Sequence, residues 1–428
     1  MKVLVVGSGG REHALAWRLS RDGGVRAVVC APGNAGTAAV ATLAAIDTAD
    51  PAALLALAER ESIDLTVIGP ELPLDRGVVD RFREAGRRIF GPPRAAAQLE
   101  CSKVFAKGFM ARHGIPTARY RVCATSDEAR AVVASGELGF PVVLKADGLA
   151  AGKGIVVSRD RVEAEATIHA AMDERRFGSA GARLVVEECL SGPEVSFFAL
   201  CDGTRAVPIA SAQDHKRVFD NDEGPNTGGM GAFSPSPLVD AAVEARILRE
   251  CVDPVLRGMR DDGTEYRGFL YAGLMMTCTG PKVIEYNVRF GDPEAQVVMP
   301  LIDGELLPLI AAAADGHLAD ARVRLRRLVS VGVVLASAGY PGPVKSGTVI
   351  SGLESAARVP DATVFHAGTA RRDDRLVTAG GRVLTVVATG ANYGAAIDRA
   401  YEAVSLISFE GMQYRRDIGR KALQSPNA

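Results

Sequence analysis

The sequence predicts an α/β protein of about three domains, because it has 428 residues and one domain usually takes roughly 150. From Lys2 to about Phe90, short apolar runs such as LVV and LTVI alternate with helical stretches such as REHALAWRL. Strands that alternate with helices form βαβ units and a parallel sheet. From about Val329 the pattern is β-rich and ends in a helical stretch from Tyr393 to Leu406.

The same patterns give the expected domain boundaries. The first domain covers residues 1–101, where Asp50 before Pro51 marks a helix start and Gly-Pro pairs punctuate the strand ends. The second covers residues 102–326, beginning with a helix that Gly114 stops and continuing with apolar strands such as FLYAGLMMT and KVIEYNV. Residues 327–428 form the third.

Composition and charge exclude several classes of protein. Hydrophobic residues make up 47% and charged residues 24%, as in a globular chain with buried cores. Lys and Arg number 50 against 51 Asp and Glu, so the net charge of -1 offers no basic field for nucleic acid. Pro32 and Gly33 interrupt the uncharged stretch 27–46, so no membrane span is expected. Seven cysteines without a CxxC pair, and a start without a secretory apolar segment, predict a cytoplasmic protein.

The motif VLVVGSGGREHALA, residues 3–16, is a candidate anion site. Its strand runs through Gly9 and Gly10 into a helix, whose first backbone N–H groups and dipole attract phosphate. Arg11 favours the same ligand. Glu12 stands where a dinucleotide fingerprint needs its third glycine, which argues against nicotinamide. A glycine turn that serves packing alone is the alternative.

Two further loops, APGNAG at 31–36 and GPELPL at 69–74, also follow predicted strands. The carboxyl ends of parallel strands meet at one crevice, so these loops are expected beside the glycine turn. Asn34 and Glu71 would then be available to bind hydroxyl or amine groups. Each loop taken singly is more often a plain turn, and their common position is what favours a site.

Lys145 ends an apolar strand and is followed by ADGLAAGKG, residues 146–154. Three glycines, Gly152 among them, predict a mobile tip that can close over polyphosphate and exclude water. The spacing differs from that of a Walker A loop, and a plain hairpin is the alternative. Lys103 and Lys107, on the preceding helix, would ordinarily form a solvated face.

Two later segments carry polar side chains out of strands. In EECLSGPE, residues 187–194, the backbone could pair with an adenine edge and Glu194 could accept from ribose hydroxyls. In VIEYNVRFGDPE, alternation puts Glu285, Asn287 and Arg289 on one face of a strand. The oxygens of the first two suit Mg²⁺, and the guanidinium would offset anionic substrate charge. A salt-bridged strand is the alternative.

Residues 213–237 show no convincing helix or strand, and loops of that length inside compact domains are usually functional or disordered. Asp214, His215 and Lys216, followed by a glycine group that includes Gly229, favour function. His215 is a candidate base, and a structural hydrogen-bonding role for it is equally open.

Together these motifs give the chain a family resemblance. From GSGGREHALAW through APGNAGT, GPE, SKVFAK, KADGLAAGKG, QDHKR, NTGGMGA and EYNVRFGDPE, the whole chain resembles the phosphoribosylamine–glycine ligases, which are ATP-grasp ligases. The resemblance implies an ATP-grasp fold with an N-terminal Rossmann-like domain, a mobile lid at about 120–188 and a C-terminal β-rich α+β domain. It also implies the second step of de novo purine synthesis, in which ATP drives the joining of glycine to 5-phosphoribosylamine through glycyl phosphate.

The candidate residues divide by expected role. The resemblance implies that Lys103 and Lys145 contact phosphates, that Glu187 and Leu190 form the adenine hinge and that Glu194 contacts ribose. With Gly152, these are the residues expected to bind ATP. The expected metal ligands, for Mg²⁺ or Mn²⁺, are Glu285 and Asn287, and the expected catalytic residues are Lys145, Arg289 and Asp214. The expected substrate-binding residues are Gly9, Gly10, Arg11, Glu12, Asn34, Glu71, Asp214, Lys216, Gly229 and Arg289.

Some features stay open at this stage. Residues 274–276, LMM, hold no acidic residue where many other ATP-grasp enzymes place a second metal carboxylate, so the metal number is open. The enzyme is expected to act as a monomer on small molecules. The alternatives are another ATP-grasp carboxylate–amine ligase, a nicotinamide-dependent oxidoreductase and a nucleotide sensor without catalysis.

Overall fold

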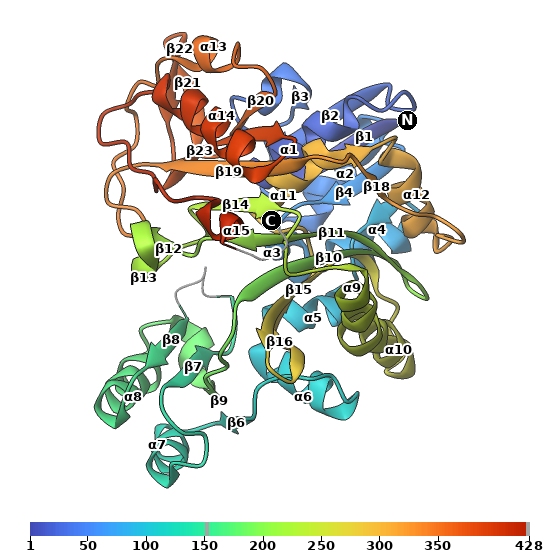
Figure 1. Ribbon diagram of the computed structural model, residues 1–428. Helices are drawn as coiled ribbons and strands as arrows, with labels where there is room; N and C mark the ends of the chain where they lie inside the picture. The colour runs from blue at the N-terminus through green and yellow to red at the C-terminus, as the bar shows by residue number, and fades with distance from the viewer. Residues whose placement is uncertain (150–153, 425–428) are drawn as a thin grey trace.

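The computed structural model describes residues 1–149 and 154–424, and it is a mixed α/β structure (Figure 1). The N-terminal part forms a five-stranded parallel sheet in the order β3-β2-β1-β4-β5. Its strands are β1 (Lys2–Gly7), β2 (Ala27–Pro32), β3 (Thr42–Leu43), β4 (Leu65–Ile68) and β5 (Ile89–Phe90). Its helices are α1 (Gly10–Leu19), α2 (Pro51–Arg60), α3 (Glu71–Asp75) and α4 (Val78–Glu84). The predicted βαβ pattern is confirmed.

Three loops leave this sheet at one edge. In the register of β1, Gly7 lies opposite Pro32 of β2, and Val6 lies opposite Ile68 of β4. The glycine turn and the loops after Pro32 and Ile68 therefore start side by side, as the parallel topology predicts.

A second sheet, of four antiparallel strands in the order β6-β9-β7-β8, follows helices α5 (Arg94–Cys101) and α6 (Lys103–Arg112). Its elements are β6 (Tyr120–Cys123), α7 (Ser126–Ser135), β7 (Val142–Ala146), β8 (Ile155–Ser158), α8 (Arg161–Ile168) and β9 (Leu184–Glu188). They have a core of their own, in which Ala129 of α7 and Ala164 of α8 pack with Leu144 and Val186. They stand apart at the lower left of Figure 1. We call this unit the lid sheet; its motion stays a prediction.

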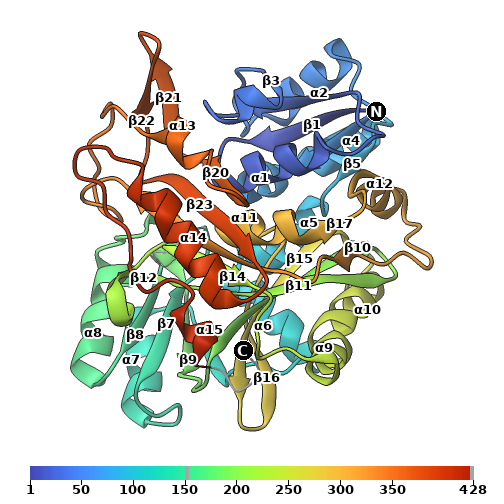
Figure 2. The same ribbon diagram turned by 45° about the horizontal axis from the view of Figure 1, so that its top comes forward.

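The largest sheet has eight antiparallel strands in the order β16-β15-β10-β11-β14-β19-β23-β20 (Figure 2). They are β10 (Glu194–Asp202), β11 (Ala206–Asp214), β14 (Gly231–Ser234), β15 (Arg267–Thr277), β16 (Gly280–Asn287), β19 (Val329–Ala336), β20 (Ala362–His366) and β23 (Arg382–Gly390). β14 pairs with β11 on one side and with β19 on the other. The strands before and after residue 327 therefore belong to one continuous sheet.

The expectation of no strand within residues 213–237 is wrong. The segment contains the end of β11, a hairpin of β12 (Arg217–Phe219) and β13 (Glu223–Asn226), and the strand β14. These strands have three or four residues, too few for a periodic pattern. β14 is held by backbone bonds to β19, about a hundred residues later in the chain, so local sequence gives no sign of it.

The predicted C-terminal helix is confirmed as α14 (Tyr393–Ser405), whose Ala396, Ala400 and Ala403 are buried in a core with strands β19 and β23. Other helices are α9 (Ala241–Ile247), α10 (Asp253–Asp261), α11 (Glu294–Val298), α12 (Leu307–Asp315), α13 (Leu353–Ala356) and α15 (Arg420–Leu423). Two further short strand pairs are β17 (Ile302–Asp303) with β18 (Arg324–Leu325), and β21 (Thr369–Arg372) with β22 (Arg375–Thr378).

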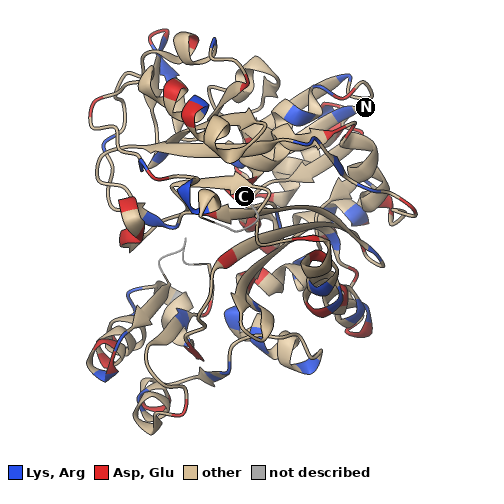
Figure 3. Cartoon of the chain, in the orientation of Figure 1, with Lys and Arg blue, Asp and Glu red and all other residues tan. Residues whose placement is uncertain are grey.

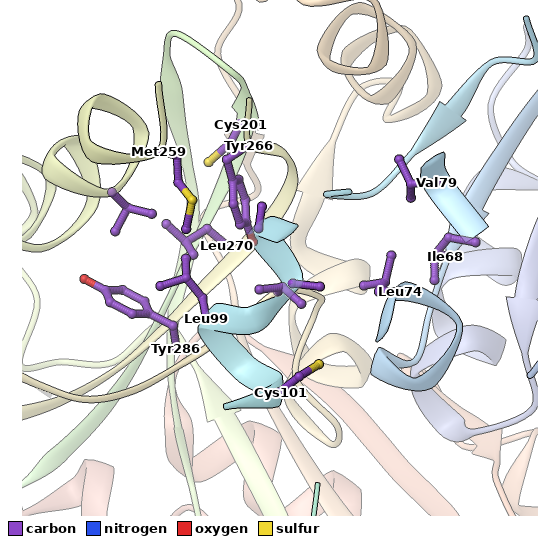
Figure 4. Close-up of a cluster of buried hydrophobic side chains, with 14 of the residues drawn as sticks. Ile68, Leu74, Val79, Leu99, Cys101, Cys201, Met259, Tyr266, Leu270 and Tyr286 are labelled. Carbon is purple, nitrogen blue, oxygen red and sulfur yellow. The ribbon is translucent and has the colours of Figure 1, made fainter. Parts of the chain in front are cut away.

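One hydrophobic core joins the parallel sheet to the eight-stranded sheet. Ile68, Leu74 and Val79 from the first unit belong to the same cluster of buried residues as Leu270 and Tyr286 (Figure 4). Burial of apolar surface is the main stabilising term of a fold, so this shared core holds the loops of the first unit at a fixed position relative to β16.

Basic and acidic residues are interspersed along the whole chain (Figure 3), in keeping with the net charge of -1. In the described part of the chain, no helix combines the length and the apolar character needed to cross a membrane.

Candidate active site

A cavity of about 440 Å³ is lined by residues from each of the three sheets and their loops. The N-terminal loops supply Arg11 and Glu71, the hairpin between β7 and β8 supplies Gly148 and Ile155, and the C-terminal region supplies Arg382. Eight of the residues singled out from the sequence line it: Arg11, Glu71, Lys103, Asp214, Lys216, Glu285, Asn287 and Arg289. Within this set of eight, the fold brings together residues that lie up to about 280 positions apart.

Glu285 and Asn287 lie two residues apart on β16 and both face the cavity, as strand alternation predicts. Lys103 Nζ lies 3.8 Å from Glu285 Oε2. Burial opposes ionisation of Glu285, but Lys103 and further cations outweigh it and lower the pKa to about 2. Glu285 is therefore a carboxylate at neutral pH. A carboxylate oxygen beside an amide oxygen fits Mg²⁺, which takes one or two protein ligands and completes its shell with phosphate oxygens and water.

Arg289 is held between two carboxylates. Its guanidinium lies 2.7 Å from Glu100 Oε1 and 3.4 Å from Glu71 Oε2. Burial alone would lower the pKa of Arg289, but the two carboxylates raise it above its ordinary range. Arg289 is therefore always charged but partly neutralised, and Glu71, expected to bind substrate, already has an ion-pair partner.

Lys145 on β7 and Glu187 on β9 form a buried pair beside the cavity. Lys145 Nζ lies 3.1 Å from Glu187 Oε2 and donates to the carbonyl of Ile284 at 3.0 Å. A second lysine, Lys107, contacts the same carboxylate oxygen at 3.0 Å. The expectation of a solvated face is wrong for Lys107, which is 2% exposed, because α6 packs this side against the lid sheet.

Two adjoining cavities, of about 420 and 370 Å³, open on the glycine turn, and Gly9 lines both. Asp292 lines all three cavities. Arg11 is shared by the first cavity and the smaller neighbour, and Arg382 by the first cavity and the larger neighbour. The three cavities therefore lie side by side between β16 and the loops of the parallel sheet.

Glu12 explains in physical terms why a dinucleotide does not fit this turn. Its carboxylate accepts from the backbone N–H of Gly9 at 2.6 Å and from Arg11 Nε at 2.6 Å. An anion thus already occupies the N-terminus of α1, where a dinucleotide fold places its pyrophosphate. A Cβ on Gly10 would lie 2.4 Å from Gln296 Nε2, so Gly10 serves a close approach between the first unit and α11.

Asn34 lies at the edge of one neighbouring cavity, but its amide is engaged with the backbone. Nδ2 donates at 2.8 Å to the carbonyl oxygens of Ser8 and His366, and Oδ1 accepts from the N–H groups of Gly36 and Thr37. An asparagine side chain offers two donor hydrogens and two acceptor positions, so these four bonds engage it fully. Asn34 therefore shapes the loop, and the expected direct bond to substrate has no free atom.

Asp214 ends β11, Lys216 follows two residues later, and both line the cavity. Burial raises the pKa of Asp214 above its ordinary range, while Lys216 opposes the shift and nearby carboxylates add to it. Lys216 pairs with Glu194, the expected ribose contact. The φ of Gly229 is +112°, and a Cβ there would lie 2.4 Å from Pro293 Cδ, so only glycine fits this turn against the loop after β16.

Three further candidates from the sequence are Leu190, Gly152 and His215. Leu190 is half-buried in the connection between β9 and β10, and Gly152 lies outside the described residues. His215 is fully buried, packs against Phe233, and neither ring nitrogen has a hydrogen-bond partner in the described residues. Burial lowers its pKa to about 3, so the ring is neutral at neutral pH. His215 does not belong to the lining of the cavity.

Sequence reasoning missed three residues that organise the cavity. Arg382 donates to the carbonyl oxygens of Gly228 at 2.6 Å and Asp292 at 2.7 Å. The Tyr340 hydroxyl accepts from the N–H of Gly228 at 2.9 Å. Arg382 and Tyr340 belong to the β-rich C-terminal region, where they follow no motif. Asp292 stands in the RFGDPE motif, and its position next to Arg289 was the available signal.

Comparison with known proteins agrees with this geometry. Three models of the phosphoribosylglycinamide synthetase family match the chain: the N domain at residues 1–100, the ATP-grasp (A) domain at 101–295 and the C domain at 330–421. The phosphoribosylamine–glycine ligase of Ralstonia nicotianae is 51% identical over 425 residues, covering 99% of this chain and 100% of that protein. The one from Brucella melitensis biotype 1 is 50% identical over 428 residues, with full coverage of both.

Solved structures show the same fold. The phosphoribosylamine–glycine ligase of Thermotoga maritima superposes with a TM-score of 0.85 at 36% identity, covering 97% of this chain and 100% of that one. A biotin carboxylase from Campylobacter jejuni has a TM-score of 0.74 at 17% identity, covering 100% of this chain and 95% of that one, which shows likeness of fold alone.

The fold and the cavity define an ATP-grasp ligase. Within that class, the chain belongs to the phosphoribosylglycinamide synthetase family. The resemblance and the fold class predicted from the sequence are thereby confirmed.

Proposed function

We propose that this chain joins glycine to 5-phosphoribosylamine with cleavage of ATP to ADP and phosphate, in purine biosynthesis. One observation carries the proposal at the level of the site. The cavity that holds Glu285, Asn287 and Lys103 shares Asp292 in its lining with the two cavities that border the glycine turn. An enzyme that activates a carboxylate with ATP and then adds a phosphosugar amine needs such neighbouring cavities.

The chemistry of amide formation assigns the charged residues. The carboxylate of glycine is a poor electrophile, and attack on the γ-phosphate of ATP converts one of its oxygens into a leaving group as glycyl phosphate. Lys103, Lys145 and Arg289 would offset negative charge that develops in this transfer. Mg²⁺ held by Glu285 and Asn287 would neutralise phosphate charge when bound. No protein nucleophile is required.

Asp214 is the residue best suited to bind the amino group of glycine. Its carboxyl group lines the cavity, where Lys216 is the main cation acting on it. Lys216, two residues along, also pairs with Glu194, and an ammonium group bound beside Asp214 would favour the carboxylate form of Asp214. Binding glycine by both ends would orient its carboxylate toward the phosphate side of the cavity.

The phosphosugar would bind in the two cavities that Gly9 borders, outside the N-terminus of α1 that Glu12 occupies. Arg11 lines both the first cavity and its smaller neighbour, so it can contact the sugar phosphate while the amine reaches the acyl carbon. Acyl phosphates hydrolyse in water. Gly148 and Ile155 of the β7–β8 hairpin already line the cavity, and closure of the lid sheet over it would exclude water.

The alternatives predict different substrates. A nicotinamide-dependent oxidoreductase would need pyrophosphate at the turn that Glu12 occupies. A nucleotide sensor would bind ATP without turnover, and a biotin carboxylase-like ligase would respond to bicarbonate and biotin. About half of the residues are identical to those of phosphoribosylamine–glycine ligases over the full length of the chain, which favours the proposed reaction.

The test measures ADP release with each substrate omitted in turn. We expect release only when ATP, Mg²⁺, glycine and 5-phosphoribosylamine are all present, and no response to bicarbonate with biotin. ADP release that is independent of glycine would contradict the proposal.

A further inference from the structure

Lys107 is a buried cation on α6, beside the nucleotide site proposed above. It lies one helical turn after Lys103 on α6, and its side chain is 3% exposed. A buried ammonium group is costly unless it is paired and hydrogen-bonded. Nζ of Lys107 lies 3.0 Å from Glu187 Oε2 and donates to Thr117 Oγ1 at 2.7 Å. Burial lowers the pKa of Lys107 to about 8 while Glu187 opposes the shift, so the group stays protonated at neutral pH.

Glu187 receives both of its lysines on the same oxygen. Lys107 and Lys145 contact Oε2 at 3.0 and 3.1 Å. The other oxygen, Oε1, is buried and accepts no hydrogen bond from the described residues. A buried carboxylate oxygen without a donor is unfavourable, so Oε1 is a position that a ligand with an N–H group would satisfy.

We infer that Lys107 is a positioning residue for the nucleotide base: it fixes Oε2 of Glu187, which leaves Oε1 to accept from an exocyclic amine. The inference rests on the ATP site proposed above. Adenine presents an amine at the position where guanine has a carbonyl oxygen. In a bound guanine, this oxygen and Oε1 of Glu187 would both be acceptors, and no hydrogen bond could form between them. Lys107 thereby contributes to the choice of ATP over GTP.

The charge balance of the cluster points the same way. Two ammonium groups and one carboxylate leave one net positive charge in the buried cluster of Lys107, Lys145 and Glu187. Without Lys107, the charge of Lys145 would be balanced by Glu187 and less available to a phosphate. Removing Lys107 should therefore weaken ATP binding as well as base selection.

The contacts also place Lys107 between two units of the fold. Lys107 belongs to α6, whereas Lys145 and Glu187 belong to the lid sheet. The hydroxyl of Tyr120, on the lid strand β6, donates to the backbone carbonyl of Lys107 at 3.0 Å. In this structure, a lysine of α6 outside the lid sheet therefore helps to set the orientation of Glu187 on β9.

The experiment compares ATP with GTP in wild type, Lys107→Met and Lys107→Arg, with glycine and 5-phosphoribosylamine saturating. For Lys107→Met we expect KM for ATP to rise about tenfold and the ATP over GTP preference in kcat/KM to fall about tenfold, the loss of one charge-assisted hydrogen bond. KM for glycine should stay unchanged. Lys107→Arg should recover most of the preference, because a charged donor remains.

Lys282→Met is the matched control. Lys282 Nζ lies 3.8 Å from Glu188 Oε1, the next carboxylate on β9, and this variant should keep both nucleotide constants at the wild-type level. Melting curves confirm that each variant is folded. If Lys107→Met does not fold, Thr117→Val removes the hydroxyl oxygen that accepts from Lys107 Nζ, and we expect a smaller loss of the ATP over GTP preference.

Glu187→Gln separates failure of the inference from failure of the proposed site. If folded Lys107→Met keeps the wild-type preference while Glu187→Gln loses it, the inference about Lys107 is wrong and the ATP site stands. If neither variant changes the constants for ATP or GTP, the proposed ATP site itself is wrong and the inference falls with it.

Discussion

Asn34→Ala should destabilise the protein by an amount that follows from the hydrogen bonds of this side chain. The substitution removes four bonds, two donated to the carbonyl oxygens of Ser8 and His366 and two accepted from Gly36 and Thr37. At about 1 kcal/mol for each bond, the loss is about 4 kcal/mol. An unfolding entropy of about 2 cal/mol/K per residue over 428 residues gives about 0.9 kcal/mol/K, so the melting temperature should fall by about 4 °C.

Differential scanning calorimetry measures this shift, and Asn392→Ala is the matched control. Asn392 is an exposed N-cap whose side chain accepts one bond, from Ala395, so its loss should cost about 1 kcal/mol, or about 1 °C. If Asn34→Ala melts within about 1 °C of wild type and KM for 5-phosphoribosylamine rises strongly, Asn34 is a direct ligand and the reasoning is refuted.

Two further predictions concern the metal pair and the C-terminal region. Glu285→Gln should lower kcat at least about 100-fold because it replaces a charged metal ligand with a neutral amide of similar shape, and an unchanged rate of ADP release would contradict the metal assignment. Arg415 is fully buried and pairs with Asp222 and Asp417. Burial opposes the ionisation of both carboxyl groups. Hydrogen bonds from Arg415 to both groups, and from Lys421 to Asp222, outweigh burial and lower both pKa values. Carboxylates with lowered pKa stabilise the fold above pH about 4 and lose that contribution as the pH falls further. Between pH 6 and pH 3.5 the melting temperature of the wild type should therefore fall by more than that of Arg415→Met. Equal decreases would show that the ion pairs of Arg415 contribute nothing to this pH dependence.

The parts of the fold that could be predicted rest on local pattern. Apolar runs and helix signals before residue 100 predicted the parallel sheet. A strand covered on both faces is apolar along its whole length, and residues Val3 to Val6 of β1 are wholly buried. The Glu285 and Asn287 pair followed from the period of two in a strand. Both inferences needed only residues close together in the chain.

The parts that could not be predicted depend on tertiary contacts. The burial of Lys107 follows from the approach of α6 to Glu187, which lies 80 residues later. The engagement of Asn34 depends on a bond to His366, and the strand β14 depends on β19. Arg382 and Tyr340 reach the cavity only because the eight-stranded sheet continues through the C-terminal region.

A crystal grown with a non-hydrolysable ATP analogue and Mn²⁺ tests most directly whether one cavity binds the nucleotide and its metal. Anomalous diffraction should show a Mn²⁺ peak bound by Glu285 and Asn287, with the triphosphate beside Lys103 and the adenine amine at Glu187 Oε1. A nucleotide bound outside this cavity, or a metal peak away from β16, would contradict the account.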